Sequence, residues 1–397
     1  MKRSSFGVLA TILFATLVCC PCKSWAQTFT FSTLYSFKSS GTGPNTPVGF
    51  LIIDSEDNLY GLSLSGGTYG MGTVFKITSK GKLSVLHSFR GGPTDGEEGQ
   101  ALPAFTQGLA MDKSGNLYGT VPQGGNSTAC SNSRGCGVAF KLTPSGTETI
   151  LYNFAEYSGS SNVILDSEGN LYGTATSNSD SGVVYEIKDG TLSVLYSFCA
   201  LPGCEDGAFP SSGLVRDSPG NLYGVTSDGG SADEGTVFKL TPSGVETVLH
   251  SFLGSSTDGS SPGGNLKQDS AGNLYGTTAF GDPGNGGVLF EQPEDGKEET
   301  VLYSFCTLSG CVQSFNPVGP VQIDKSGNFY GVAYGPDDDF VVWEVNSVGE
   351  EAILHSFPAG MNSPGAGLVI DSAGNLYGIN SGTSTNAGSV FKLTLVK

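Results

Sequence analysis

The sequence predicts an all-β protein, a seven-bladed β-propeller with four antiparallel strands in each blade. Three observations support this prediction. One eight-residue phrase, D-x-x-x-N-[LF]-Y-G, occurs seven times along the chain. Each copy lies in a unit that contains four strand-like segments. The two ends of the chain carry segments that match different strands of one unit, so together they can complete it.

The phrase recurs at intervals of between 47 residues (Asp324 to Asp371) and 58 residues (Asp54 to Asp112). A period of this length with several strands per copy is typical of a propeller or a solenoid. The chain contains 60 glycines among many Val, Leu, Tyr and Phe residues, which favours short strands joined by tight turns. The seven copies begin at Asp54, Asp112, Asp166, Asp217, Asp269, Asp324 and Asp371.

One unit can be followed in full over residues 213–252. Its four expected strands are "GLVRD", "NLYGVT", "GTVFKLT" and "VETVLHSF", separated by "SPG", "SDGGSADE" and "PSG". Adjacent Leu and Tyr in "NLYG" point to opposite faces of a strand, and both faces of a propeller blade are buried against neighbours.

The ends of the chain indicate a closed ring. Residues 28–37, "TFTFSTLYSF", match the fourth strand of the unit, and residues 388–397, "GSVFKLTLVK", match the third. Pairing them would complete the seventh blade and remove an exposed strand edge. We therefore expect residues 28–397 to form a single propeller.

The phrase itself is interpreted as a turn between the first and second strands. Its glycine suits a left-handed turn position, and its Asp and Asn can bond to the local backbone. In the first copy Asp57 replaces the glycine, and Asp tolerates this conformation. The alternative is a calcium loop, but the ligand spacing of an EF-hand is absent.

The first 26 residues have the composition of a secretory signal peptide. Lys2 and Arg3 precede an apolar run of about 15 residues, which is short for a membrane span, and Ser24-Trp25-Ala26 offers a small-x-small cleavage site. We expect residues 1–26 to be removed, leaving an extracellular or periplasmic protein without a membrane span. A membrane anchor and a lipoprotein are the alternatives.

The net charge is −18, and it becomes −21 when Lys2, Arg3 and Lys23 are removed with the leader. This charge argues against nucleic acid and anionic membranes as partners. Six cysteines then remain, and an even number in an exported chain indicates disulfides. The expected neighbouring pairs are Cys130 with Cys136, Cys199 with Cys204, and Cys306 with Cys311.

The chain resembles the GloVer tandem-repeat proteins, a family of exported bacterial repeat proteins. The resemblance depends on "GNLYGVTSDGGSADEGTVFKLTPSGVETVLHSF" (residues 220–252) and covers almost everything after residue 28. It implies a repeat fold and export, and it carries no activity. More distantly, "GLVIDSAGNLYG" (residues 367–378) is similar to NHL-type and gluconolactonase-type blades, a similarity of fold.

No catalytic residue is predicted. His87, His250 and His355 all stand in "LHSF", where other copies have Tyr, so we expect them on the outer strands, dispersed around the rim. At the start of the first strand most copies carry Gly, whereas two carry Asn162 and Asn265. Lactonase-like propellers hold a metal with Glu, Asn and Asp near the axis, so these two are the channel candidates.

The long, variable connections are expected on one face, around the mouth of the channel, where binding residues concentrate. They carry much of the acidic charge, and a ring of carboxylates could hold calcium. The expected acidic residues include Asp95, Asp206 and Asp258, and the ligand-binding candidates are Asp228, Asp233, Asp282, Asp337 and Asp338.

We therefore expect a monomeric, exported binding module for an extracellular glycan or protein, with no required cofactor. One alternative is a metal-dependent lactonase or esterase with its site at the channel mouth, where a carboxylate would replace the missing histidine base. A structural component of the cell envelope is the other alternative.

Overall fold

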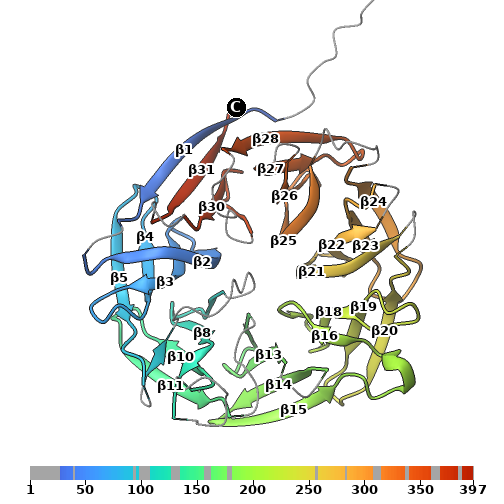
Figure 1. Cartoon of the computed structure of the whole chain (residues 1–397), viewed down its shortest axis with the longest axis horizontal. Helices are drawn as coiled ribbons and strands as arrows, with labels where there is room; N and C mark the ends of the chain where they lie inside the picture. Colours follow the sequence, from blue (N-terminus) through green and yellow to red (C-terminus); the bar gives the residue numbers. More distant parts are fainter. Residues whose placement is uncertain are drawn as a thin grey trace, which may run out of the picture.

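The computed structural model is a closed ring of seven four-stranded blades around a central axis (Figure 1). It describes residues 27–38, 41–92, 95–97, 108–126, 135–155, 162–176, 181–254, 258–281, 284–306, 314–335, 339–358, 367–382 and 387–396. Within these ranges no helix has the length and apolar character needed to cross a membrane. The predicted fold is confirmed.

Each blade is an antiparallel sheet whose strands follow one another from the axis to the rim. In blade 4 a short additional strand, β16 (Ala208–Pro210), also pairs with β18. A further short pair joins β6 (Gly96–Glu97) to β9 (Gln123–Gly124).

The strands of the blades have the following bounds. Blade 1 contains β2 (Pro44–Ile53), β3 (Leu59–Gly66), β4 (Thr73–Ile77) and β5 (Leu83–Ser88); blade 2 contains β7 (Ala110–Met111), β8 (Leu117–Val121), β10 (Val138–Leu142) and β11 (Glu148–Asn153); blade 3 contains β12 (Ile164–Leu165), β13 (Leu171–Ala175), β14 (Val183–Lys188) and β15 (Thr191–Ser197); blade 4 contains β17 (Val215–Arg216), β18 (Leu222–Asp228), β19 (Thr236–Leu240) and β20 (Glu246–Ser251); blade 5 contains β21 (Gly259–Gln268), β22 (Leu274–Gly281), β23 (Val288–Gln292) and β24 (Thr300–Ser304); blade 6 contains β25 (Phe315–Ile323), β26 (Phe329–Tyr334), β27 (Phe340–Val345) and β28 (Glu351–Phe357); and blade 7 contains β29 (Val369–Ile370), β30 (Leu376–Asn380), β31 (Ser389–Leu395) and β1 (Phe29–Ser36).

The seventh blade is built from both ends of the chain, as predicted. Strand β1 pairs antiparallel with β31, in a register that runs from Phe29 opposite Leu395 to Ser36 opposite Ser389. In Figure 1 the blue β1 lies along the red β31 at the edge of the ring. The ring therefore has no break between its first and last blades.

The repeated phrase forms the same turn in all seven blades. Its Asp accepts a hydrogen bond from the backbone N–H of the Asn four residues later, at 2.7–3.0 Å. The Asn side chain donates to the other carboxylate oxygen. The position that Asp57 occupies has a positive φ in every copy, 59° at Asp57 itself. The structural interpretation of the phrase is confirmed.

The tyrosine of the phrase has a part in this turn that the sequence did not indicate. Its hydroxyl donates to the same Asp at 2.9–3.2 Å in every blade. Burial alone raises the pKa of Asp217, but the bonds from Asn221 and Tyr223 outweigh it and lower that pKa below its usual value. Asp217 therefore stays ionised and joins the turn to the buried second strand.

The last glycine of the phrase makes room for an aromatic ring. In blade 5, Gly276 lies opposite Phe290 on the third strand, and a Cβ added to Gly276 would lie 2.6 Å from the Phe290 ring. The equivalent distance is 2.3–3.0 Å in all seven blades. The aromatic residues at this position are 0–1% exposed; they are Phe75, Phe140, Tyr185, Phe238, Phe290, Trp343 and Phe391.

Each of these rings packs against a Phe of the preceding blade, which lies at or immediately after the end of the fourth strand. The two ring centroids lie 5.0–5.8 Å apart at all seven junctions, with interplanar angles of 58–73°. Aromatic pairs favour this edge-to-face arrangement, which is worth about 0.5–1.5 kcal/mol beyond the area buried. One contact therefore repeats around the ring, and Phe37 with Phe75 makes it across the closure.

We predict that Gly276→Ala lowers the free energy of unfolding by about 1–3 kcal/mol, because the added methyl displaces the Phe290 ring. Gly263→Ala, in the same blade, is the matched control, since nothing lies within 4 Å of its added Cβ. Denaturant unfolding of the two variants measures the difference. Equal stability would contradict the space-filling account of this glycine.

We also predict that deletion of residues 28–37 abolishes cooperative thermal unfolding, because it exposes the edges of β31 and leaves Phe75 without its neighbour. Joining the same ten residues to the C-terminus through a short turn should restore a single calorimetric transition. A deletion variant that melts like the intact chain would contradict closure by β1.

Candidate functional site

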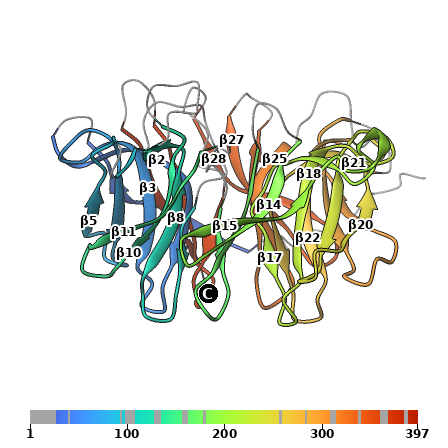
Figure 2. The same cartoon turned by 90° about the horizontal axis from the view of Figure 1, so that it is seen from below.

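The propeller has two unlike faces (Figure 2). The turn face carries the short connections between first and second strands and between third and fourth strands. The loop face carries the connections between second and third strands, such as residues 229–235, and those from one blade to the next, such as residues 198–207. The expected placement of the long connections on one face is confirmed.

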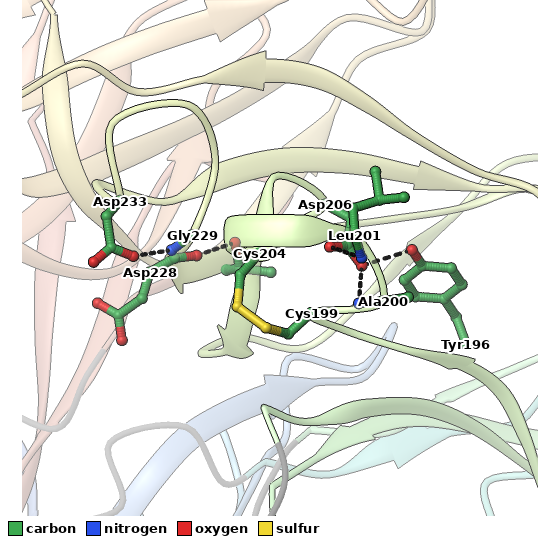
Figure 3. Close-up of a disulfide and its surroundings, with 10 residues drawn as sticks. Tyr196, Cys199, Ala200, Leu201, Cys204, Asp206, Asp228, Gly229 and Asp233 are labelled. Carbon is green, nitrogen blue, oxygen red and sulfur yellow. Dashed lines mark hydrogen bonds between the residues drawn. A yellow bond between two sulfur atoms is a disulfide. The ribbon is translucent and has the colours of Figure 1, made fainter.

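A disulfide organises the loop face at blade 4 (Figure 3). Cys199 and Cys204 are linked across a short turn that contains a 3-10 helix, η1 (Pro202–Cys204). The carbonyl of Cys204 accepts the N–H of Gly230 at 2.9 Å. The bridged segment is thereby attached to the 229–235 connection.

The other two cysteine pairs are described only in part. Cys136 and Cys306 are disulfide-bonded. Their predicted partners, Cys130 and Cys311, lie outside the described residues, so those two pairings stay predictions.

Three of the acidic residues expected in the long connections of this face are buried. Asp206 is 0% exposed and accepts hydrogen bonds from the Tyr196 hydroxyl at 2.7 Å and from the Ala200 and Leu201 amides. Asp95 and Asp258, 4% and 6% exposed, hold the equivalent segments of other blades in the same way. These carboxylates shape the loops through hydrogen bonds to the backbone.

Two of the five ligand-binding candidates fall within the described residues. Asp228 ends β18 and is half-buried, and Asp233 is exposed on the following connection. Asp233 also accepts the Gly229 N–H at 2.9 Å, so one of its oxygens fixes the loop (Figure 3). The structure brings these two together on one connection. Asp282, Asp337 and Asp338 lie outside the described residues.

Exposed aromatic side chains on the loop face were missed in the sequence. Phe209, Phe280 and Tyr334 are 45%, 41% and 37% exposed. They stand at the loop-face ends of strands in blades 4, 5 and 6, and Phe315 stacks on Tyr334 with centroids 6.0 Å apart. The signal was a departure from the repeat: "AFP" and "FNP" stand where other blades have "SSP" or "NTP".

The backbone holds Phe209 in a fixed position. Its φ is 54°, an unusual conformation for a residue before proline. Its N–H donates to the Ser181 carbonyl of blade 3 at 2.6 Å, and its carbonyl accepts the Ser227 hydroxyl at 3.2 Å. Thr46, Ser261 and Asn316 repeat the positive φ and the inter-blade bond. An aromatic ring is therefore presented to solvent from a rigid site.

The axial ends of the first strands of neighbouring blades pack against one another around the axis. Asn162 and Asn265 lie on either side of Gly213, where an added Cβ would be 2.7 Å from Asn162 and 2.9 Å from Asn265. Asn265 Oδ1 accepts the Gly213 N–H at 2.7 Å, whereas Asn162 Oδ1 has no partner among the described residues. The seven positions of this layer are Phe50, Gly108, Asn162, Gly213, Asn265, Pro320 and Gly367.

This axial layer fits a lactonase-like metal site poorly. Phe50 is 7% exposed, and its ring occupies the space beside both neighbouring glycines, Gly108 and Gly367. None of the seven positions carries a carboxylate. The two Asn candidates are brought together as expected, but they lack the acidic partners that such a metal requires.

Two groups at the rim do combine metal-ligand types. His87, Asp95 and Glu148 place one ligand atom each within 4.8 Å of one another at the junction of blades 1 and 2. His250, Asp258 and Glu299 do the same at the junction of blades 4 and 5. The histidines are dispersed around the rim as predicted. The carboxylates beside them were missed because they come from a connecting loop and from the next blade.

A third junction shows what these groups do without histidine. Tyr196 replaces the histidine there, and Asp206 and Glu246 replace its acidic partners. Tyrosine holds Asp206 by an ordinary hydrogen bond. A hydrogen bond between the ring nitrogen or hydroxyl and the Asp is therefore common to all three groups. One nitrogen and two carboxylates are also a donor set that Zn²⁺ accepts.

Burial controls the charge of these groups. It raises the pKa of Glu148 to about 8, with a further contribution from the negative charge of Asp95. It raises the pKa of Glu246 and of Glu299 to about 7. The glutamates therefore bind protons at a pH at which a glutamate in water is ionised.

The sequence profile of the Gloeobacter/Verrucomicrobia repeat matches residues 23–215 and 105–337. No curated protein matches the chain significantly.

Solved structures share the architecture at low identity. Virginiamycin B lyase from Staphylococcus aureus aligns with a TM-score of 0.57 and 14% identity, over 93% of this chain and 100% of that one. Oligogalacturonate lyase from Vibrio parahaemolyticus gives 0.56 and 9%, over 93% and 98%. A puromycin hydrolase gives 0.55 and 11%, over 90% and 54%. At these identities the likeness concerns the fold alone.

We predict that thermal stability falls as the pH rises from 5 to 8.5. The folded pKa values of Glu148, Glu246 and Glu299 lie above the value of about 4.3 in an unfolded chain, so the folded state binds more protons in this window and loses stability through it. The triple Glu→Gln variant should show a flatter dependence of Tm on pH. Glu→Gln at the exposed Glu56, Glu205 and Glu350 is the control and should leave the slope unchanged; an equal flattening would contradict the assignment.

Proposed function

The chain belongs to the Gloeobacter/Verrucomicrobia repeat family, and we propose that it is an exported binding module whose loop face recognises a neutral extracellular glycan. The observation that carries this proposal is the rigid presentation of exposed aromatic rings, above all Phe209, beside carboxylates that are free to accept hydrogen bonds.

The chemistry of this surface suits a sugar. The apolar C–H face of a pyranose can stack on an aromatic ring, and its hydroxyls can donate to the exposed Asp233 and the half-buried Asp228. Because Phe209 is fixed by bonds on both sides of its backbone, little conformational freedom is lost when a ligand covers it. The net charge of −18 opposes acidic polymers and favours an uncharged one.

Export supports the same proposal. The expected leader, the three predicted disulfide pairs and the one pair fully described here are all consistent with a compartment outside the cytoplasm. A protein ligand would also find aromatic anchors attractive. The separate, strand-end placement of Phe209, Phe280 and Tyr334 favours stacking on an extended chain of sugars over a single apolar pocket.

We predict that the exported protein is retarded in affinity electrophoresis through gels containing a neutral polysaccharide, equally in the presence and in the absence of EDTA. A panel of β-glucan, mannan, xylan and galactan provides the candidates. Phe209→Ala, Phe280→Ala and Tyr334→Ala together should raise Kd at least tenfold, or about 1.4 kcal/mol.

Val245→Ala and Val348→Ala provide the matched control, since both side chains are exposed apolar groups on the turn face. They should leave retardation unchanged. Equal loss in both variants, or no retardation by any glycan, would contradict a glycan site on the loop face. Binding that disappears only in EDTA would favour the metal-dependent alternative.

A further inference from the structure

One position on the third strand differs between blades in the sign of its charge. It lies opposite the tyrosine of the repeated phrase, as Lys76 does opposite Tyr60. Where it is lysine, the ammonium sits 5.1–5.3 Å from the centre of the tyrosine ring, and Lys76 also lies 3.9 Å from Asp54. The residues at this position are Lys76, Lys141, Glu186, Lys239, Glu291, Glu344 and Lys392.

Blade 6 has the reversed charge in the most buried setting. Glu344 is 1% exposed, whereas Glu186 and Glu291 are half-buried. The Tyr330 hydroxyl lies 3.4 Å from Glu344 and 2.9 Å from Asp324, so one phenol stands between two carboxylates. In blade 3 the guanidinium of Arg216 lies 5.7 Å from the corresponding tyrosine ring. No described Lys or Arg side chain forms an ion pair with Glu344 or Asp324.

Gln27 occupies the place where a cation is needed. Its backbone N–H donates to Glu344 Oε2 at 3.2 Å, and its side-chain amide donates to Asp324 Oδ2 at 3.2 Å. Gln27 also lines a cavity of about 280 Å³ on the turn face between blades 6 and 7, together with Lys325 and Asp371. Both of its donors therefore point at the uncompensated acidic pair.

We propose that the chain is cut between Ala26 and Gln27, and that the amino group released there forms a buried ion pair with Glu344. Hydrolysis adds water across the peptide bond, leaving a carboxylate on Ala26 and an amine on Gln27. At neutral pH that amine takes up a proton and becomes an ammonium ion. A neutral peptide N–H cannot balance a buried carboxylate, whereas an ammonium 3.2 Å away can.

The same geometry protects the new terminus. An N-terminal glutamine can cyclise when its amine attacks its own side-chain carbonyl carbon and expels ammonia, which removes the positive charge. Here the amine is directed to Glu344 and the side-chain amide to Asp324, so the two reacting groups are held by different partners. Removal of the leader would thus lock the strand that closes the ring.

The first test is the N-terminus of the protein exported from a bacterial host as the full chain. Intact mass and N-terminal sequencing should show a chain that begins at uncyclised Gln27. Another first residue, or a mass lower by one ammonia, would overturn the proposal.

The second test moves the amine away from Glu344. Insertion of Ser-Gly-Ser after Ala26 keeps the residues before the cleavage site but places the ammonium three residues before Gln27, away from Glu344. The insertion should lower Tm by about 5 °C at pH 7. It should have no further effect in Glu344→Gln, or in Glu344→Lys, which installs the residue that four other blades carry.

Glu291→Gln is the control, since it alters the equivalent position of blade 5, away from the terminus. In that background the insertion should still lower Tm by the same amount. An equal effect of the insertion with and without Glu344 would overturn the ion pair. This inference is independent of the proposed glycan site.

Discussion

The contact on which the ring depends is the edge-to-face aromatic pair between neighbouring blades. It is made by two different strands of the unit, the end of the fourth in one blade and the middle of the third in the next. A single unit therefore cannot bury either ring, and only a neighbour on each side completes it. This explains why the phrase keeps a glycine after its tyrosine: the glycine opposite Phe290 leaves the space that the ring fills. It also explains the offset of the chain ends, because strand β1 supplies Phe37 to Phe75 and extends the series across the closure.

A second constraint is the treatment of acidic groups in a chain of net charge −18. In blade 4 the Asp of the turn, Asp217, remains ionised because Asn221 and Tyr223 donate to it. The glutamates at the junctions between blades are instead protonated more readily, as Glu148 is beside Asp95. Glu344 is neither surrounded by several donors nor free of a neighbouring negative charge. Tyr330 donates one hydrogen bond to it, and the charge of Asp324 lies nearby. The differences between blades are therefore differences in how one burial problem is solved.

Repetition determined what could be predicted from the sequence. Blade number, strand order, the turn at Asp217–Asn221 and the closure by residues 28–37 follow from patterns that recur or complement each other. The hydrogen bond from Tyr223 to Asp217 could not be predicted, because a tyrosine in a strand is usually interpreted as an apolar core residue. The buried role of Asp206 was also missed, since its partners lie in a loop whose path the repeat does not define. The pairing of the two cysteines that flank that loop was predicted because they are neighbours in a chain that is expected to be exported and to keep an even number of cysteines.

The candidate site was the least predictable part for the same reason. A binding surface on a propeller consists of the positions at which a blade departs from its repeat, and a single sequence gives no measure of which departures matter. Phe209 illustrates the difficulty. Its neighbour Pro210, its positive φ and its bond to the preceding blade are all shared with residues in other blades, so the backbone is part of the scaffold. Only the side chain is particular to blade 4. The scaffold thus carries the conformational cost of a strained, rigid position whatever residue stands there, and an aromatic ring placed on it becomes a preorganised contact. A repeat fold can in this way acquire a binding site through the substitution of a few side chains on one face, without any change to the contacts that close its ring.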